Sequence, residues 1–143
     1  MKLLNNKETK GIIKRLEEQY GIKELKLDYL FFLNKDNKIF IINKDYSRLN
    51  LDLLNINSLG MYFGKIENSG IRLSIYGSQM IGKFATKNIF ETDKEEEWLN
   101  GENLECGKNL IGWVIVKSKE DYMGSGYCKN GIVMNYIKKM KKD

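Results

Sequence analysis

Residues 112 to 139 form a series of short apolar runs separated by glycine-containing turns. The runs from Trp113 to Val116 and from Ile132 to Ile137 are rich in β-branched residues, and Asn130-Gly131 supplies a tight turn before the second run. The step Gly124-Ser125-Gly126 indicates a strand that bends or that another backbone approaches closely, because only a residue without Cβ tolerates either arrangement. This pattern constrains the end of the chain to a closing β-meander.

The beginning of the chain predicts a helix followed by a hairpin. Asn5 or Asn6 can cap a helix whose apolar residues recur at helical spacing, and Gly21 can end it. Two apolar runs, at 27–33 and 38–43, flank a polar turn and indicate two antiparallel strands. A unit of this size buries too little apolar surface to be stable by itself, so it should pack against the residues that follow.

The middle of the chain alternates strands with short helices. The expected order is a strand over 59–66, a strand over 71–75, a short helix with Ser78 at its N-terminus, and a strand over 87–92. Thr92 and Glu95 match a capping box that opens a second helix, which contains Trp98. We therefore predict the fold class α+β, with a helix-plus-hairpin module at residues 1–55 and a small mixed β-barrel at residues 56–143.

The net charge of +5 is unevenly distributed along the sequence. Residues 91–105 contain seven acidic residues and one lysine, a local charge of −6, which leaves +11 on the rest of the chain. A basic body with one acidic segment is typical of a protein that binds a polyanion through a defined face. Two ordinary explanations stay open: the lysines can simply be solvated, and acidic residues at the start of a helix favour its dipole.

The residue types that enzymes and metal sites need are scarce. The chain contains no histidine, which excludes Ser-His-Asp and Cys-His catalysis and removes the most common ligand of transition metals. Cys106 and Cys128 do not have the spacing of a metal knuckle. Residues 77–83 differ from a phosphate-binding loop because Phe84 stands where the magnesium-binding hydroxyl belongs. We therefore predict no catalytic residue, no metal and no cofactor.

The sequence also bears on the compartment. No apolar run approaches the ~20 residues of a membrane helix, and the N-terminus becomes polar too soon for a signal peptide. Cys106 and Cys128 are expected to be unpaired thiols, as is usual in a reducing compartment. We therefore expect a cytoplasmic protein without a membrane partner.

The end of the chain resembles a PUA domain, the small RNA-binding barrel named after pseudouridine synthases and archaeosine transglycosylases. The resemblance spans roughly residues 56–141 and is carried by residues 112–117, 122–127 and 131–139. It is most similar to the PUA-like domain of NOL/NOP/Sun-type RNA cytosine-5 methyltransferases, in which a Gly-x-Gly turn precedes Gly-x-hydrophobic-x-Asn-x-x-Pro-Lys. Lys138 stands here in place of that proline. Stand-alone archaeal PUA proteins of the Nip ribosome-biogenesis type share the same general plan.

The resemblance implies that structured RNA, either tRNA or rRNA, binds in a basic groove between the helix near Ser78 and the end of the meander. Arg72 is expected on the polar face of its strand, and Tyr136 can stack on an unpaired base. Lysines, hydroxyls and backbone N–H groups are expected to contact mainly phosphates. The predicted RNA-binding residues are Arg72, Ser78, Gln79, Lys83, Lys87, Asn88, Gly124, Gly126, Lys129, Asn135, Tyr136, Lys138 and Lys139.

The implied function is non-catalytic RNA binding in RNA modification or ribosome biogenesis. Two alternatives stay open: a protein-interaction adaptor in ribosome assembly that uses residues 91–105, and an RNA-targeting subunit that acts in trans with a methyltransferase. The chain is not itself such a methyltransferase, because it has no glycine-rich strand-loop-helix and no Pro-Cys nucleophile motif. The predicted contacts have structural alternatives too, with Ser78 as a helix cap, Arg72 in a surface salt bridge and the last lysines as a solubilising tail.

Overall fold

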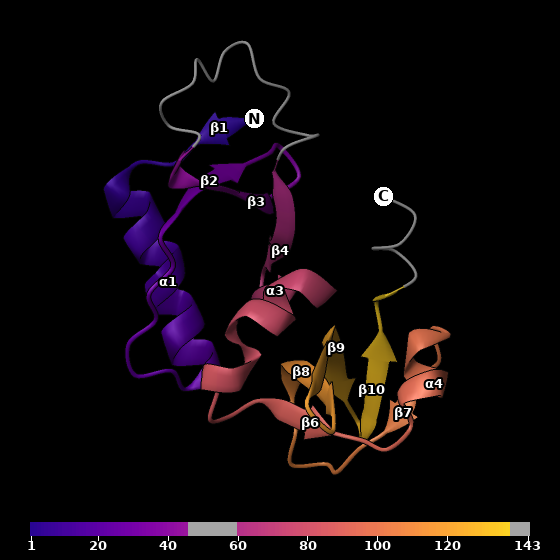
Figure 1. Cartoon of the computed structure of the whole chain (residues 1–143). Helices are drawn as coiled ribbons and strands as arrows, with labels where there is room; N and C mark the ends of the chain where they lie inside the picture. The colour runs from indigo at the N-terminus through magenta and orange to yellow at the C-terminus, as the bar shows by residue number, and fades with distance from the viewer. Residues whose placement is uncertain (46–59, 138–143) are drawn as a thin grey trace.

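Two five-stranded sheets and three α-helices make up the described part of the chain in this computed structural model (Figure 1). The structure describes residues 1–45 and 60–137. The elements are β1 (Lys2–Leu3), α1 (Asn6–Tyr20), β2 (Tyr29–Leu33), β3 (Lys38–Asn43), β4 (Met61–Glu67), β5 (Gly70–Leu73), α3 (Ile75–Ile81), the 3-10 turn η3 (Gly82–Phe84), β6 (Ile89–Glu91), α4 (Glu95–Leu99), β7 (Leu104–Glu105), β8 (Gly112–Ser118), β9 (Asp121–Lys129) and β10 (Ile132–Asn135). The predicted α+β class is confirmed, whereas the PUA type of barrel stays a prediction. Among the described helices, none has the length and apolar character needed to cross a membrane.

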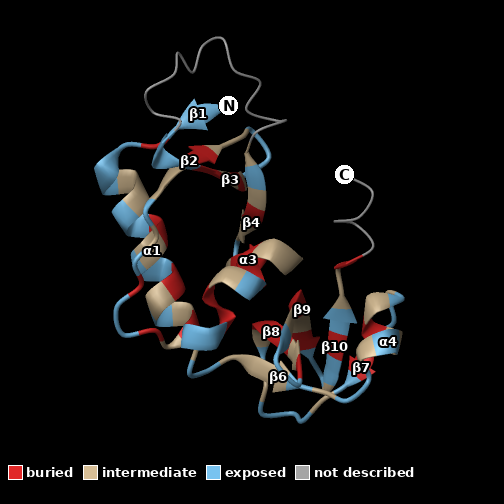
Figure 2. Cartoon of the chain, viewed as in Figure 1, coloured by how far each residue is buried: buried red, intermediate tan, exposed pale blue. Residues whose placement is uncertain are grey.

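Helix α1 begins and ends where the sequence predicted. The Asn5 side chain accepts a hydrogen bond from Glu8 N, and the Glu8 side chain accepts one from Asn5 N, so a capping box satisfies two amides of the first turn. Gly21 ends the helix in the left-handed conformation at φ 64°, which a residue without Cβ adopts at low cost. Leu16 and Tyr20 are fully buried, and Figure 2 shows the buried stripe on the inner side of the helix.

The first sheet has the strand order β1-β2-β3-β4-β5, and all neighbouring strands in it are antiparallel. The predicted hairpin is confirmed as β2 and β3, joined by a turn in which Asn34 Oδ1 accepts hydrogen bonds from Asp36 N and Lys38 N. β4 pairs with β3, so the first part of the chain and its middle share one sheet. The predicted boundary at residue 55 lies outside the described residues and stays a prediction.

The second sheet has the order β6-β8-β9-β10-β7 and contains the predicted meander, formed by β8, β9 and β10. β6 runs parallel to β8, and the other neighbouring strands are antiparallel. Asn130 at φ 56° and Gly131 at φ 81° form the predicted tight turn between β9 and β10. The two edge strands, β6 and β7, line one open groove, so the sheet curls into a partial barrel.

Helix α3 starts earlier than predicted. Its N-cap is Ser74, whose hydroxyl accepts a hydrogen bond from Gly77 N at 2.9 Å. The same hydroxyl donates to Phe63 O on β4 at 3.0 Å, so Ser74 both ends β5 and starts the helix. Ser78, which was expected at the N-terminus, lies inside α3 and is fully buried. The helix lies between the two sheets and packs on β4 and β9 (Figure 1).

Helix α4 lacks the predicted capping box. It begins at Glu95, and no side chain caps it. The Thr92 hydroxyl accepts a hydrogen bond from Lys94 N, within the turn that precedes the helix. Because this turn extends to Lys94, Glu95 becomes the first residue of the helix instead of its third.

Buried serines join the two sheets. The Ser125 hydroxyl on β9 accepts a hydrogen bond from Leu73 N on β5 at 2.8 Å, and the Ser78 hydroxyl on α3 accepts one from Gly124 N at 2.8 Å. The Tyr20 hydroxyl donates to the backbone of β5 and lies within hydrogen-bonding reach of the Ser125 hydroxyl. Burial raises the pKa of Tyr20 well above its ordinary value, so the hydroxyl keeps its proton. These bonds satisfy polar groups that become buried where the sheets meet.

Replacing Ser125 with alanine is expected to lower the free energy of unfolding by about 1–3 kcal/mol, because Leu73 N then stays buried without an acceptor. Urea unfolding followed by circular dichroism measures the change. The matched control is Ser69→Ala in the exposed β4–β5 turn, which should alter the free energy of unfolding by less than about 0.5 kcal/mol. Equal stability of the two variants would contradict the role given to Ser125.

Candidate nucleic-acid interface

The end of helix α3 and the β8–β9 hairpin lie side by side. α3 packs on β9, and η3 continues the chain from its last turn. A Cβ at Gly82 would lie 2.3 Å from Cδ1 of Tyr122, far inside van der Waals contact. The Tyr122 ring therefore rests on the backbone at the end of α3, and only glycine at residue 82 leaves room for it.

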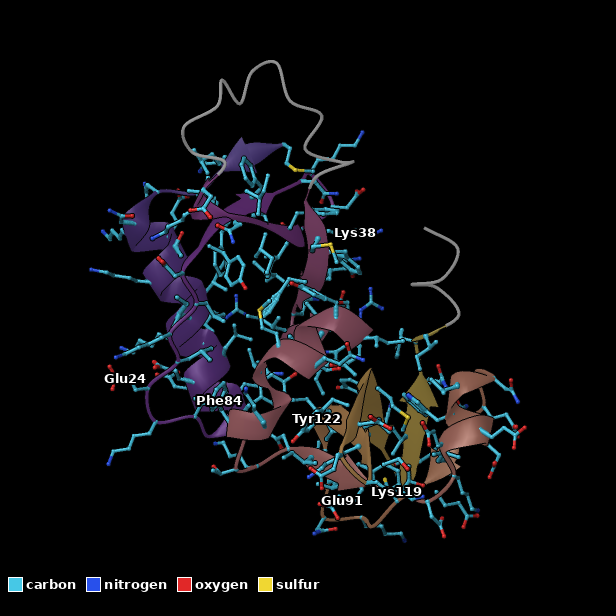
Figure 3. The ribbon with its side chains drawn as sticks, viewed as in Figure 1. Glu24, Lys38, Phe84, Glu91, Lys119 and Tyr122 are labelled. Carbon is cyan, nitrogen blue, oxygen red and sulfur yellow. The ribbon has the colours of Figure 1, made fainter. Side chains whose placement is uncertain are left out.

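Two lysine and aromatic pairs lie at this place. Lys83 Nζ is 5.1 Å from the centre of the Phe84 ring, and Lys117 Nζ is 5.4 Å from the centre of the Tyr122 ring. Phe84 is 51% exposed, which is unusual for so large an apolar side chain. Figure 3 shows Phe84 on η3 and Tyr122 on β9, beside the end of α3. We call Lys83, Phe84, Lys117 and Tyr122 the lysine–aromatic patch.

The lysines of this region have no carboxylate partner in residues 1–45 and 60–137. The lysines that form ion pairs there are Lys2, Lys26, Lys44 and Lys65. Lys87 adds a third cation near the patch: its backbone N–H donates to Tyr20 O at 3.2 Å, which docks the chain on the end of α1, and its side chain is exposed. Cations without a carboxylate partner beside the exposed Phe84 ring supply both positive potential and a stacking surface.

Two of the predicted RNA contacts serve the fold. The Ser78 hydroxyl donates a hydrogen bond to Ile75 O within α3 and accepts one from Gly124 N. Its proton and one of its acceptor positions are therefore already used inside the protein. Asn88 has the left-handed φ of 58°, its side-chain amide donates to Gln19 O, and its carbonyl oxygen accepts from Ile115 N. Because these groups are already bonded inside the protein, we leave both residues out of the interface.

The predicted glycines and Asn135 organise the core of the second sheet. Gly124 has φ 82°, and a Cβ at Gly126 would lie 2.4 Å from Val133 Cγ1 and 2.8 Å from Trp98 Cη2. Asn135 Nδ2 donates to Trp98 O at 2.7 Å. The sequence predicted a bend or the approach of another backbone at the Gly-Ser-Gly step, whereas the closest groups at Gly126 are the side chains of Val133 and the fully buried Trp98.

The remaining polar and basic residues of the predicted site fall into two places. Gln79 on α3, Lys83 on η3 and Lys87 are exposed near the lysine–aromatic patch. Lys129 ends β9, whereas Tyr122 lies near the start of that strand, so Lys129 is at the opposite end of the hairpin. Lys138 and Lys139 lie outside the described residues.

Arg72 does not lie on an exposed polar face, and that expectation is wrong. Only 7% of the residue is exposed. Its guanidinium Cζ is 5.7 Å from the centre of the Trp113 ring and 5.1 Å from the centre of the Tyr136 ring. Strand β5 contributes Ile71 and Leu73 to the first core and also packs on β8, so the face that carries Arg72 is largely covered. Of the predicted contacts, the structure thus brings Arg72 and Tyr136 together.

Lys117 and Tyr122 were not among the residues predicted from the sequence. They are directly opposite each other across the β8–β9 turn, so the register of the hairpin is the signal that pairs them. Their position beside Gly82 is a contact between segments about 40 residues apart, which no local pattern reveals.

An acidic groove opens between the edge strands β6 and β7. It encloses about 690 Å³, and its carboxylates come from Glu91, Asp93, Glu95 and Glu105, with Lys94 and Lys119 also lining it. Figure 3 shows Glu91 and Lys119 at this end of the second sheet. Among the described residues, no three His, Cys, Asp or Glu side chains are grouped so as to hold a metal ion.

The two cysteines are free thiols that lie close together. Burial, with a smaller contribution from the neighbouring Cys106, raises the pKa of Cys128 to about 12. Cys128 is therefore a protonated thiol at neutral pH, which makes it a poor nucleophile.

A search with protein-family models finds no match to this sequence, and a comparison with curated proteins finds none either. The resemblance of residues 56–141 to PUA domains therefore stays an expectation from the sequence.

Proposed function

We propose that this chain is a non-catalytic, cytoplasmic RNA-binding protein that recognises structured tRNA or rRNA, in RNA modification or ribosome biogenesis. The observation that carries the proposal is the lysine–aromatic patch, in which an exposed phenylalanine and a tyrosine alternate with lysines that no described carboxylate neutralises. The resemblance of the C-terminal residues to PUA domains points to the same class of ligand.

The chemistry of the patch suits RNA better than a small anion. Lysines offer point charges to phosphates, while the exposed ring of Phe84 offers a stacking surface to an unpaired base. The surplus charge of +11 outside residues 91–105 adds long-range attraction for a polyanion. Because point charges contribute most of the binding, the protein would read the shape and backbone of a folded RNA more than its base sequence.

RNA affinity is expected to depend strongly on salt. If Lys83, Lys87 and Lys117 each contact one phosphate, log K should fall with log salt at a slope of about −3, so a rise from about 50 to 200 mM salt should weaken binding about 40-fold. Fluorescence anisotropy with a labelled, folded tRNA measures the slope. An unchanged affinity over this range would rule out binding through phosphate contacts.

The acidic groove favours a second candidate function, that of an adaptor for a basic protein partner in ribosome assembly. Four carboxylates line it, and it lies on the edge strands; Glu91 at its rim is paired in register with Lys117 of the lysine–aromatic patch. Affinity capture from cell extract with and without nuclease separates the two functions. Partners held through RNA leave after nuclease treatment, whereas a protein bound in the groove stays.

A further inference from the structure

A second cluster lies where the two sheets join. Arg72 on β5, Trp113 on β8 and Tyr136 after β10 form it, and the Trp113 and Tyr136 ring centres are 5.0 Å apart. Tyr127 packs against Trp113 at 4.9 Å between ring centres. The cluster is separate from the lysine–aromatic patch, because helix α3 lies between the end of β5 and η3.

Two N–H groups of this cluster have no acceptor within the described residues. They are Arg72 Nε and Trp113 Nε1, and both atoms are closed off from solvent. The other tryptophan is ordinary, since Trp98 Nε1 donates to Met123 O at 2.8 Å. Buried donors are nearly always paired, so two unpaired ones in one cluster indicate that a partner from outside the described residues belongs here.

The charge of Arg72 is also unbalanced. No carboxylate in the described part of the chain pairs with it, and the faces of the Trp113 and Tyr136 rings carry no full negative charge. Only Nε is both closed off and unpartnered, so the two Nη atoms keep contact with solvent. The guanidinium is therefore held in place by two rings while one edge stays accessible.

We propose that Arg72 and Trp113 form a binding site for a phosphate group of the bound RNA. This inference rests on the RNA-binding function proposed for the chain and names a contact within it. The groups here donate hydrogen bonds and carry positive charge, so the ligand must supply several acceptor oxygens and negative charge. A guanidinium edge binds two phosphate oxygens at once, and the indole N–H can donate to a third acceptor when a shift of the rings packed on Trp113 uncovers it.

The position of the site favours an RNA phosphate over a free anion. Helix α3 is seven residues long, or about 10 Å, and it separates Arg72 from the lysine–aromatic patch. A single RNA strand that crosses α3 can therefore reach both places. The patch would attract the strand, and the Arg72–Trp113 site would fix its register, because its hydrogen bonds are directional while those of lysine are not.

The site can be tested by NMR on the 15N-labelled full chain. The sequence contains two tryptophans and three arginines, so the indole and Arg Nε–H signals are few and resolvable. The variants Trp113→Phe and Arg72→Lys assign the two donors. Inorganic phosphate, acetate at equal ionic strength, and a short oligoribonucleotide with and without a 5′-phosphate are the probes. We expect phosphate and the oligonucleotide to shift the Trp113 and Arg72 signals and to leave the Trp98 signal in place.

The comparison of probes identifies the source of the phosphate. Equal shifts with and without the 5′-phosphate indicate a backbone phosphodiester, and shifts that need it indicate a terminal phosphate. Trp113→Phe keeps the ring but loses the N–H, and should weaken binding of the oligonucleotide about tenfold. Either result, a backbone phosphodiester or a terminal phosphate, supports the Arg72–Trp113 site.

Three outcomes would overturn the inference. If the oligonucleotide binds and both donor signals stay unchanged, the site is wrong while the RNA-binding function stands. If acetate shifts them as much as phosphate does, the site takes a carboxylate instead. If inorganic phosphate shifts the two donor signals but no RNA binds the chain, the site binds a phosphate that does not come from RNA. The proposed RNA-binding function is then wrong as well.

Discussion

Trp98→Ala is expected to lower the free energy of unfolding by about 4 kcal/mol. Trp98 is fully buried on α4, and its ring fills the space that Gly126 leaves open on β9. Its indole N–H donates to Met123 O at 2.8 Å, so truncation leaves a large cavity and an unsatisfied carbonyl. For a chain of this size, such a loss is a large fraction of the typical total stability of about 5–15 kcal/mol.

The matched variant is Trp98→Phe, which keeps an aromatic ring in the cavity and removes the N–H group. It should cost about 1–3 kcal/mol, clearly less than the alanine variant, because less volume is lost. Guanidinium unfolding followed by fluorescence of Trp113 measures both variants. A loss below about 1 kcal/mol for Trp98→Ala would show that α4 does not close the second core.

The elements that the sequence predicted correctly are those whose signal is local. The cap at Asn5, the stop at Gly21 and the tight turn at Asn130-Gly131 each depend on a few neighbouring residues with special backbone or side-chain chemistry. The two apolar runs that form β2 and β3, with the polar turn between them, likewise need no information from the rest of the chain. The structure therefore confirms the cap, the helix stop, the tight turn and the hairpin.

The errors share a different cause, because they depend on contacts between distant segments. Arg72 alternates with apolar residues as an exposed strand residue would, but β8 covers the face that the alternation assigns to solvent. Ser74 and not Ser78 caps α3, because its hydroxyl also bonds to β4. The site is affected in the same way: Lys83 was predicted, whereas Tyr122, which packs on the neighbouring Gly82, comes from a strand about 40 residues later.

Reversing the charge of both patch lysines, in the double variant Lys83→Glu and Lys117→Glu, is expected to weaken binding of folded RNA on the order of 100-fold at low salt. Each substitution removes an attraction for a phosphate and adds a repulsion. Lys83 is exposed and Lys117 is partly exposed, and neither lysine forms an ion pair with a described residue, so the free energy of unfolding should change by less than about 1 kcal/mol. The slope of log K against log salt should also become shallower by about 2.

The most direct test of RNA binding through the lysine–aromatic patch compares this variant with a double variant of identical charge elsewhere. Lys10→Glu and Lys35→Glu change exposed residues on α1 and in the β2–β3 turn, and both double variants take the net charge from +5 to +1. The measurement is the affinity of each for one folded tRNA at one salt concentration. The account predicts a loss on the order of 100-fold for the patch variant and about threefold or less for the other. Equal losses in the two variants would show that the RNA responds only to net charge, and would contradict a defined interface.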